Sequence, residues 1–281
     1  MRATVHNLKS YAKINLSLNV IGKRKPNKLH SIETFVSLIN LADEIKINEV
    51  DSKNHKVIFI GKFSKGIPKV NTITKLLKLM DKKKLLQKKY EFLIKKNIPQ
   101  QSGMGGGSMN AATILSFFKS EKILTKKQTE NFAQKIGSDV ILGLNRLSKI
   151  YYSDGKVYEI KKSLKYYLVL VKPNFGCSTR KIFSLNKVFS KKQFSKSKKN
   201  ISKNIIFNSK NDLENSAFKA HPKLKQLKNQ LINWKKAEFV RMTGSGSTLV
   251  MYFNSNETAK NALKTFKRRL NNSWCILSKV I

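Results

Sequence analysis

The first strong pattern in the chain is a strict alternation of apolar and polar residues near its N-terminus. Ile14, Leu16, Leu18 and Val20 fall on one face, and Lys13, Asn15, Ser17 and Asn19 fall on the other. A period of two predicts a β-strand with one buried and one exposed face. Further strands are expected at residues 32–39, 44–47, 57–60, 90–94, 166–172, 238–242, 247–253 and 274–277.

Capping residues mark the starts of several predicted helices. Asn71 can cap a helix that runs to about residue 82, and Thr125 with Gln128 fits a capping box for another. Pro222 suits the first position of a later helix. Other helices are expected at residues 108–119, 212–219 and 257–270, with a short one after Ser178. Asp154-Gly155 indicates a hairpin turn between two strands.

The length of 281 residues suggests about two domains, and 40% apolar residues are enough to build their cores. The first half mixes many strands with helices, whereas the second half is typical of a smaller α+β layer domain. We place the boundary between domains 1–165 and 166–281. The Lys/Ser-rich residues 187–203 show little periodicity and are interpreted as a mobile insertion or loop.

Charge is the most extreme property of the composition. The chain has 57 basic and 16 acidic residues, a formal net charge of +41, and all but seven of the basic residues are lysine. Sequence-specific nucleic-acid readers favour arginine and interleaved aromatic residues. Because the lysines are spread along the whole chain, we interpret them as solvated surface residues. A field that attracts an anionic substrate, or true nucleic-acid binding, remains an alternative.

Other classes of protein are disfavoured by what the sequence contains. The two cysteines form no CxxC motif and the four histidines form no HxxxH pair, which argues against a disulfide framework and a protein-only metal site. No apolar stretch approaches the ~18 residues of a membrane span. Lysines interrupt the first apolar residues, so no signal-peptide core is present and a cytoplasmic protein is expected.

A glycine-rich loop carries the clearest chemical signal. Residues 99–112 read Pro-Gln-Gln-Ser-Gly-Met-Gly-Gly-Gly-Ser-Met-Asn-Ala-Ala, between a predicted strand and a predicted helix. Glycine lets the backbone approach a ligand closely, and free amide groups at a helix N-terminus favour phosphate. The loop is neither a Walker A motif nor GxGxxG. The alternative is a flexible turn that binds nothing.

This loop resembles the central motif of the GHMP kinases, Pro-x-x-x-Gly-Leu-Gly-Ser/Gly-Ser-Ser-x-Ala-Ala, with Met104 in place of Leu. The doubled Gly106-Gly107 is similar to one branch, which phosphorylates 4-diphosphocytidyl-2-C-methyl-D-erythritol in the non-mevalonate isoprenoid pathway. Four further family motifs occur in the family's order: Ala12-Lys13-Ile14-Asn15-Leu16, Lys28-Leu29-His30, Gly137-Ser138-Asp139-Val140-Ile141 and Thr243-Gly244-Ser245-Gly246. Asn211-Asp212-Leu213-Glu214, which lies between the last two of these, is also similar to a family segment. The sequence departs from the family pattern at Leu29 (usually Tyr), Met109 (Ser) and Ile141 (Pro).

The resemblance implies an α+β fold with the two-domain GHMP kinase architecture. An N-terminal α/β layer domain and a C-terminal ferredoxin-like α+β domain would hold the active site in the cleft between them. It also implies an ATP-dependent phosphotransferase with an alcohol as acceptor, with ATP and Mg²⁺ and without a specific nucleic acid or membrane, as a monomer or homodimer. Homoserine, mevalonate or a sugar is the alternative acceptor.

The resemblance also implies roles for individual residues. Asp139 matches the catalytic base, although Asp is also favoured as a helix N-cap, and Lys13 would stabilise charge on the transferred phosphoryl group. The implied ATP-binding residues are Pro99, Gly103, Met104, Gly105, Gly106, Gly107, Ser108 and Met109. The implied substrate-binding residues are Asn15, His30, Thr179, Phe183, Gly244 and Ser245. Ser108 could help place magnesium or simply cap its helix; Phe183 could belong to the core, and residues 244–246 could be a plain turn.

Overall fold

The computed structural model describes residues 5–23, 30–152, 154–161, 164–194 and 201–281. They form two compact units. Unit 1 contains Met1–Lys13, Leu41–Gln100 and Gly105–Asn145, and unit 2 contains Ile14–Asn40, Gln101–Met104 and Arg146–Ile281. The boundary predicted at residue 165 falls inside unit 2. A division into sequence-continuous domains therefore stays a prediction.

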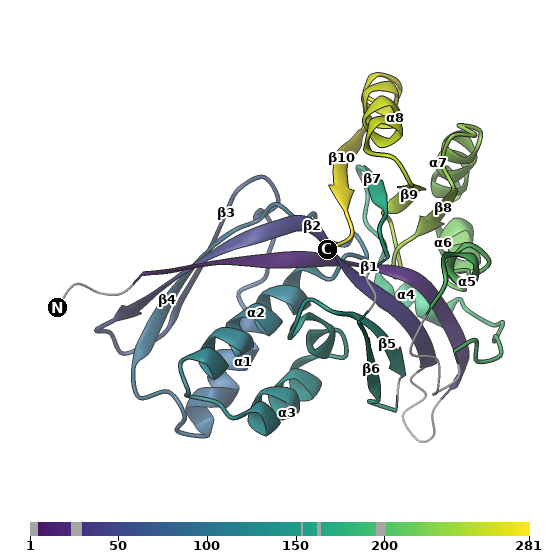
Figure 1. Cartoon of the computed structure of the whole chain (residues 1–281). Helices are drawn as coiled ribbons and strands as arrows, with labels where there is room; N and C mark the ends of the chain where they lie inside the picture. The colour runs from purple at the N-terminus through teal and green to yellow at the C-terminus, as the bar shows by residue number, and fades with distance from the viewer. Residues whose placement is uncertain (1–4, 24–29, 153, 162–163, 195–200) are drawn as a thin grey trace. The chain divides into compact units, whose positions relative to one another are not determined.

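Two long strands, β1 (His6–Lys23) and β2 (His30–Val50), pair with each other and run through both units (Figure 1). β2 joins two strands that were predicted separately. Its 21 residues contain no glycine or proline, so nothing in its backbone interrupts the strand.

Unit 1 is built from mixed strands and three α-helices. β3 (Lys56–Ile60) runs parallel to β4 (Lys89–Lys95), and β4 pairs antiparallel with the second half of β2. The helical elements are α1 (Thr72–Lys82), α2 (Gly106–Ser120), α3 (Lys126–Ile136) and the 3₁₀ turn η1 (Val140–Gly143). Side chains such as Leu76, Phe92 and Phe118 are fully buried in its core. The predicted caps Asn71 and Thr125 are confirmed, each with a complete capping box.

Unit 2 contains a hairpin and a four-stranded sheet. β5 (Ser148–Tyr152) pairs with the first part of β2 and with β6 (Val157–Ile160). β7 (Tyr167–Pro173), β8 (Phe239–Met242), β9 (Leu249–Phe253) and β10 (Ser273–Lys279) form an antiparallel sheet in the order β10-β7-β9-β8. Its helices are α4 (Thr179–Ser184), α5 (Lys203–Phe207), α6 (Glu214–Ala220), α7 (Pro222–Ile232) and α8 (Asn256–Arg269). This strand order and the βαββαβ succession are ferredoxin-like, as predicted.

The prediction of an exposed polar face on β1 was wrong. Lys13, Asn15, Ser17 and Asn19 are each at most 4% exposed, as buried as the apolar residues between them. Buried polar groups need partners. Ser17 Oγ accepts the Phe35 N–H, and the Asn19 amide donates to Glu33 at 3.0 Å. Hydrogen bonding, which alternation cannot reveal, therefore permits burial of both faces.

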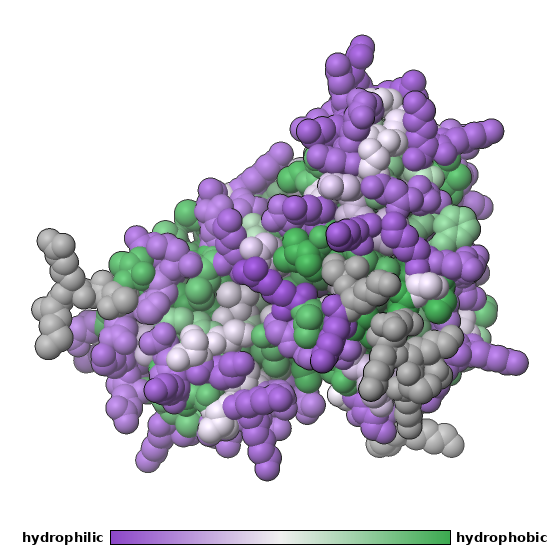
Figure 2. Space-filling view, in the orientation of Figure 1, coloured by the Kyte–Doolittle hydropathy of each residue, from purple (hydrophilic) through white to green (hydrophobic). Residues whose placement is uncertain are grey.

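Most lysines in the described part of the chain are exposed, in agreement with their interpretation as surface residues. Figure 2 shows hydrophilic side chains over most of the visible face, with apolar patches between them. No helix among the described residues is both long and apolar enough to span a bilayer. Of the predicted loop 187–203, residues 195–200 lie outside the described residues; residues 187–194 contain no helix or strand, and α5 begins at Lys203.

Candidate active site

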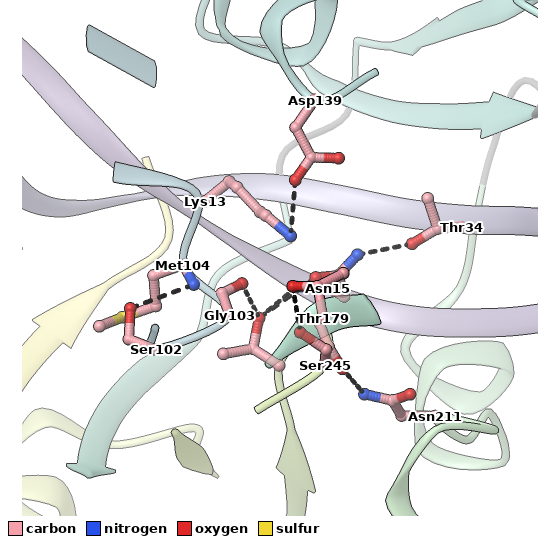
Figure 3. A network of polar contacts seen from close by, with 12 residues as sticks. Lys13, Asn15, Thr34, Ser102, Gly103, Met104, Asp139, Thr179, Asn211 and Ser245 are labelled. Carbon is pink, nitrogen blue, oxygen red and sulfur yellow. Dashed lines mark hydrogen bonds and ion pairs between the residues drawn. The ribbon is translucent and has the colours of Figure 1, made fainter. Parts of the chain in front are cut away.

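In unit 1 a lysine and an aspartate from distant parts of the chain form an ion pair. Lys13 belongs to β1, and Asp139 is the residue immediately before η1. Lys13 Nζ lies 3.3 Å from Asp139 Oδ2 (Figure 3). The Lys13 side chain is 5% exposed and that of Asp139 is 35% exposed. Asp139 occupies the N-cap position of η1, but its side chain makes no capping hydrogen bond. The geometry therefore gives the carboxylate a cationic partner rather than a capping role.

The N-terminus of α2 lies beside the same lysine. Gly105 is its N-cap residue with φ of +69°, and a Cβ there would lie 3.1 Å from two carbons of the Lys13 side chain. Only glycine meets both the backbone angle and the close contact. The helix starts at Gly106, two residues before the predicted start. Ser108 is thus its third residue and not its cap.

No side chain caps α2, unlike α1, α3, α4, α5 and α8, whose N-caps each accept a backbone N–H. The first N–H groups of a helix have no intrahelical partner, and the helix dipole adds partial positive charge at that end. The N–H groups of Gly106, Gly107 and Ser108 are therefore suited to bind an anion such as phosphate.

A buried ion pair that the sequence did not reveal supports this helix start. Lys96 pairs with Asp43, and their residues are 4% and 0% exposed. Asp43 also accepts the N–H groups of Asn97 and Ile98, each at 2.8 Å. A Cβ on Gly106 would lie 3.2 Å from Lys96 Nζ. The pair thus fixes the segment that leads into the glycine loop.

Three of the predicted nucleotide-binding residues are buried. Pro99 is buried, and Met104 and Met109 are at most 1% exposed. In this structure their side chains belong to the interior. Any contact of these residues with nucleotide would fall to their backbone, and their binding role stays a prediction.

In unit 2 the two glycine loops meet backbone to backbone. A Cβ on Gly103 would lie 2.0 Å from the Thr243 carbonyl oxygen, and a Cβ on Gly244 would lie 2.8 Å from the Gly103 carbonyl oxygen. Both residues have positive φ, +75° and +54°. Gly103 is therefore required for this close approach, whatever else it binds.

Asn15 and Thr243 connect β1 to the second loop. The Asn15 N–H donates to Thr243 Oγ1 at 3.0 Å, and its side-chain amide donates to Thr34 Oγ1 at 2.8 Å. Thr243 Oγ1 lies 3.4 Å from the Gly103 carbonyl oxygen. Thr243 belongs to the motif Thr243-Gly244-Ser245-Gly246, which indicates no role for this residue. Its fully buried hydroxyl could be assigned only from the fold.

Thr179 and Ser245, both predicted to bind substrate, are brought together in unit 2. Their hydroxyl oxygens are 2.9 Å apart. Thr179 is the first residue of α4, whose N-cap Ser178 accepts the Lys181 N–H as the sequence predicted. Two neighbouring hydroxyls can both donate to and accept from a polar ligand.

His30 lies against two aromatic rings in unit 2. The centroid of its ring is 5.3 Å from that of Phe183 and 6.4 Å from that of Phe189. Burial, together with Lys23, lowers the pKa of His30, although a backbone hydrogen bond to Asn186 raises it. Its Nε2 is buried without a hydrogen-bond partner in the described part of the chain. Leu29 lies outside the described residues. Phe189, 45% exposed, was missed because it lies in the Lys/Ser-rich stretch.

The donors in unit 1 suit a metal that arrives with phosphate. Among the described residues no group of three or more His, Cys, Asp or Glu side chains could hold a metal ion. Mg²⁺ usually keeps several waters and binds through one or two carboxylates plus substrate phosphates. The partly exposed Asp139 carboxylate and Ser108 hydroxyl offer oxygens of this kind.

Comparison with known proteins identifies the family. The model of the GHMP kinases N terminal domain matches residues 71–147, and that of the GHMP kinases C terminal domain matches residues 192–272. The chain therefore belongs to the GHMP kinase family and is an ATP-dependent kinase.

Relatives narrow this assignment. A 4-diphosphocytidyl-2-C-methyl-D-erythritol kinase from Pelagibacter ubique is 48% identical over 98% of both chains, and one from Clostridium tetani is 30% identical over 98% of this chain and 99% of its own. Within the family, the chain belongs with the 4-diphosphocytidyl-2-C-methyl-D-erythritol kinases. A crystal structure of 4-(cytidine 5'-diphospho)-2C-methyl-D-erythritol kinase shares the fold, with a TM-score of 0.76 at 20% identity, covering 98% of this chain and all of the other.

Proposed function

We propose that the chain transfers the γ-phosphoryl group of ATP to the 2-hydroxyl of 4-diphosphocytidyl-2-C-methyl-D-erythritol, giving ADP and the 2-phosphate. The observation that carries this proposal is the Lys13–Asp139 pair, 3.3 Å apart in the same unit as the uncapped N-terminus of α2. The name of the 48% identical relative supports the choice of acceptor.

Asp139 is proposed to accept the proton of the acceptor hydroxyl. Phosphoryl transfer needs placement and charge stabilisation more than covalent help, and a positioned carboxylate supplies the base. One carboxylate oxygen faces Lys13, and the side chain is still exposed enough for a ligand to reach it. The Lys13 ammonium orients this carboxylate and adds positive charge for the transferred phosphoryl oxygens.

The N-terminus of α2 is proposed to hold the triphosphate through the N–H groups of Gly106, Gly107 and Ser108. Magnesium, bound with ATP, would offset the charge between its phosphates. The Ser108 hydroxyl and the Asp139 carboxylate are the side chains of unit 1 that could face this ion. Pro99, Gly103, Met104, Gly105 and Met109 are proposed to shape the loop around the nucleotide.

The acceptor is proposed to bind through unit 2. The His30 Nε2, which has no hydrogen-bond partner among the described residues, can hydrogen-bond a pyrimidine ring, and Phe183 and Phe189 offer aromatic faces to it. The paired hydroxyls of Thr179 and Ser245, with Gly244 and Asn15, are proposed to contact its polar remainder.

A coupled ADP-release assay tests the function, with 4-diphosphocytidyl-2-C-methyl-D-erythritol, mevalonate, homoserine and galactose as acceptors. We expect turnover with the cytidylyl compound alone. Turnover with another acceptor instead would move the chain to another branch of the family. Salt-dependent RNA binding without any ADP release would favour the nucleic-acid alternative.

Asp139→Asn tests the base. It removes the proton acceptor and keeps the size of the side chain, so we expect kcat to fall by about 100-fold or more, with ATP binding retained. Asp154→Asn, the same change in the exposed turn between β5 and β6, is the matched control and should leave kcat unchanged. Turnover of Asp139→Asn within about threefold of wild type would show the base assignment to be wrong.

A further inference from the structure

The segment Asn211-Asp212-Leu213-Glu214 lies at the centre of a set of buried hydrogen bonds in unit 2. Asn211 is 4% exposed and Leu213 is fully buried. The Asn211 side-chain amide donates to the carbonyl oxygens of Met242 and Gly244, both at 2.8 Å. Figure 3 shows Asn211 reaching this loop next to Ser245. One side chain thus satisfies one carbonyl group at the end of β8 and one in the second glycine loop.

The other members of the segment reach neighbouring parts of the same structure. Glu214 Oε1 accepts the Met242 N–H at 2.7 Å, while its Oε2 lies 2.5 Å from Lys228 Nζ. Asp212 Oδ2 accepts the Val20 N–H at 2.8 Å, and the Asp212 N–H donates to the Leu18 carbonyl at 2.9 Å. The segment therefore joins β1 to the last residue of β8.

We propose that this segment is a clamp that positions the Thr243–Gly246 loop for the acceptor, with Asn211 as its central positioning residue. The proposal rests on the proposed function, because that loop matters only as part of the acceptor site. Thr243 and Gly244 contact Asn15 and Gly103, and Ser245 contacts Thr179. A shift of the loop would displace every one of these groups.

The chemistry of Asn211 explains why an amide is required. Two carbonyl oxygens need donors, and the Asn211 Oδ1 accepts the Leu213 N–H at 3.0 Å in return. An amide NH₂ offers two donors next to one acceptor, whereas a carboxylate offers acceptors only. In Asn211→Asp a negative oxygen would face two carbonyl oxygens in a buried site, which is unfavourable.

The clamp should affect the acceptor more than the nucleotide, although the loop also packs against Gly103 of the nucleotide loop. The loop and all its partners named above belong to unit 2, whereas the amide groups of α2 belong to unit 1. For Asn211→Asp we expect kcat/KM for 4-diphosphocytidyl-2-C-methyl-D-erythritol to fall by about tenfold or more, and the Kd for ATP to change by less than about twofold.

Two controls separate positioning from general stability. Asn208→Asp makes the same change at an exposed position, where the side chain donates to Asn204 Oδ1, and should leave both constants unchanged. Leu227→Ala removes a buried core side chain of the same unit. It should lower the unfolding temperature without changing the KM for the acceptor. If Asn211→Asp does not fold, Asn211→Ser, which keeps one donor, should give a smaller loss in the same direction.

Hydrogen–deuterium exchange of the full-length protein tests the clamp without any assay of activity. Asn211→Asp should speed exchange at the Thr243 and Gly246 amides, which are hydrogen-bonded within the loop, and leave α2 unchanged. If wild type lacks the proposed activity while this exchange pattern holds, the proposed function fails and the clamp survives as a structural device. Unchanged exchange over residues 242–248, or an unchanged kcat/KM for the acceptor in an active enzyme, would overturn the positioning role.

Discussion

A methyl group at Gly103 would meet both a backbone strain and a steric block. The φ of +75° costs an L-residue about 1 kcal/mol or more. The new Cβ would lie 2.0 Å from the Thr243 carbonyl oxygen, which accepts the Gly246 N–H at 3.0 Å. Moving that carbonyl breaks a buried hydrogen bond, a loss of about 1–3 kcal/mol. We expect Gly103→Ala to lower the free energy of unfolding of unit 2 by about 3 kcal/mol or more.

The measurement is urea unfolding followed by far-ultraviolet circular dichroism, which reports both units, and by tryptophan fluorescence. Both tryptophans of the chain, Trp234 and Trp274, lie in unit 2, so the signal reports the unit that contains Gly103. The midpoint and slope give the free energy of unfolding in water. Gly103→Ala and its control, Gly107→Ala, differ only in which glycine of the same motif is changed.

Gly107→Ala is the matched control. Gly107 is helical with no positive φ, and its added Cβ would have Thr72 Oγ1 as nearest neighbour at 3.4 Å, an ordinary contact. Alanine is favoured over glycine in a helix by about 1 kcal/mol, so stability should be unchanged or slightly raised. Gly103→Ala with a free energy of unfolding within about 1 kcal/mol of wild type would refute the packing argument.

Two further predictions concern unit 2. Burial lowers the pKa of Lys149 to about 8, against the opposing effect of Glu159. Because this folded-state pKa lies below the unfolded value of 10.5, burial of the charged lysine destabilises the fold below pH 8, and the penalty is relieved as pH rises towards 10.5. Lys149→Met should therefore raise the free energy of unfolding by up to about 3 kcal/mol at pH 7 and less at pH 10; equal effects at both pH values would contradict this. Phe189→Ala should raise the KM for the cytidylyl acceptor by about fivefold and leave the KM for ATP unchanged, since one aromatic face is worth about 1 kcal/mol; an unchanged acceptor KM in steady-state assays would exclude Phe189 from the site.

Local signals in the sequence predicted most of the elements because their causes are local. A cap needs one side chain within three residues of its target, so Asn71 and Thr125 could be identified directly, as could Pro222 at the first position of α7. The five-residue helix α5 was missed because one turn leaves too short a pattern to detect. The start of α2 was misplaced because it depends on the left-handed backbone of Gly105, which glycine permits but does not require.

The polar contacts within each unit could not be predicted because their partners are distant in sequence. Asn15 meets Thr243, and Lys13 meets Asp139, only after the chain has folded. The family motifs identify these residues as site residues but do not show which of them are in contact. Asp43 and Lys96 lie in none of the family motifs, and nothing in their spacing distinguishes them from the other charged residues.

Two of the few carboxylates of the chain are buried and have specific partners. Only 16 acidic residues accompany 57 basic ones, yet Asp43 and Glu33 are fully buried. Glu33 accepts three donors, from Asn19, Gln193 and Phe194, and Asp43 holds Lys96. Burying a carboxylate is costly unless donors surround it, so each of these positions has a specific structural reason to be acidic. The two buried carboxylates thus hold particular segments in place: Glu33 binds the backbone of Gln193 and Phe194, and Asp43 binds the segment that leads into the glycine loop.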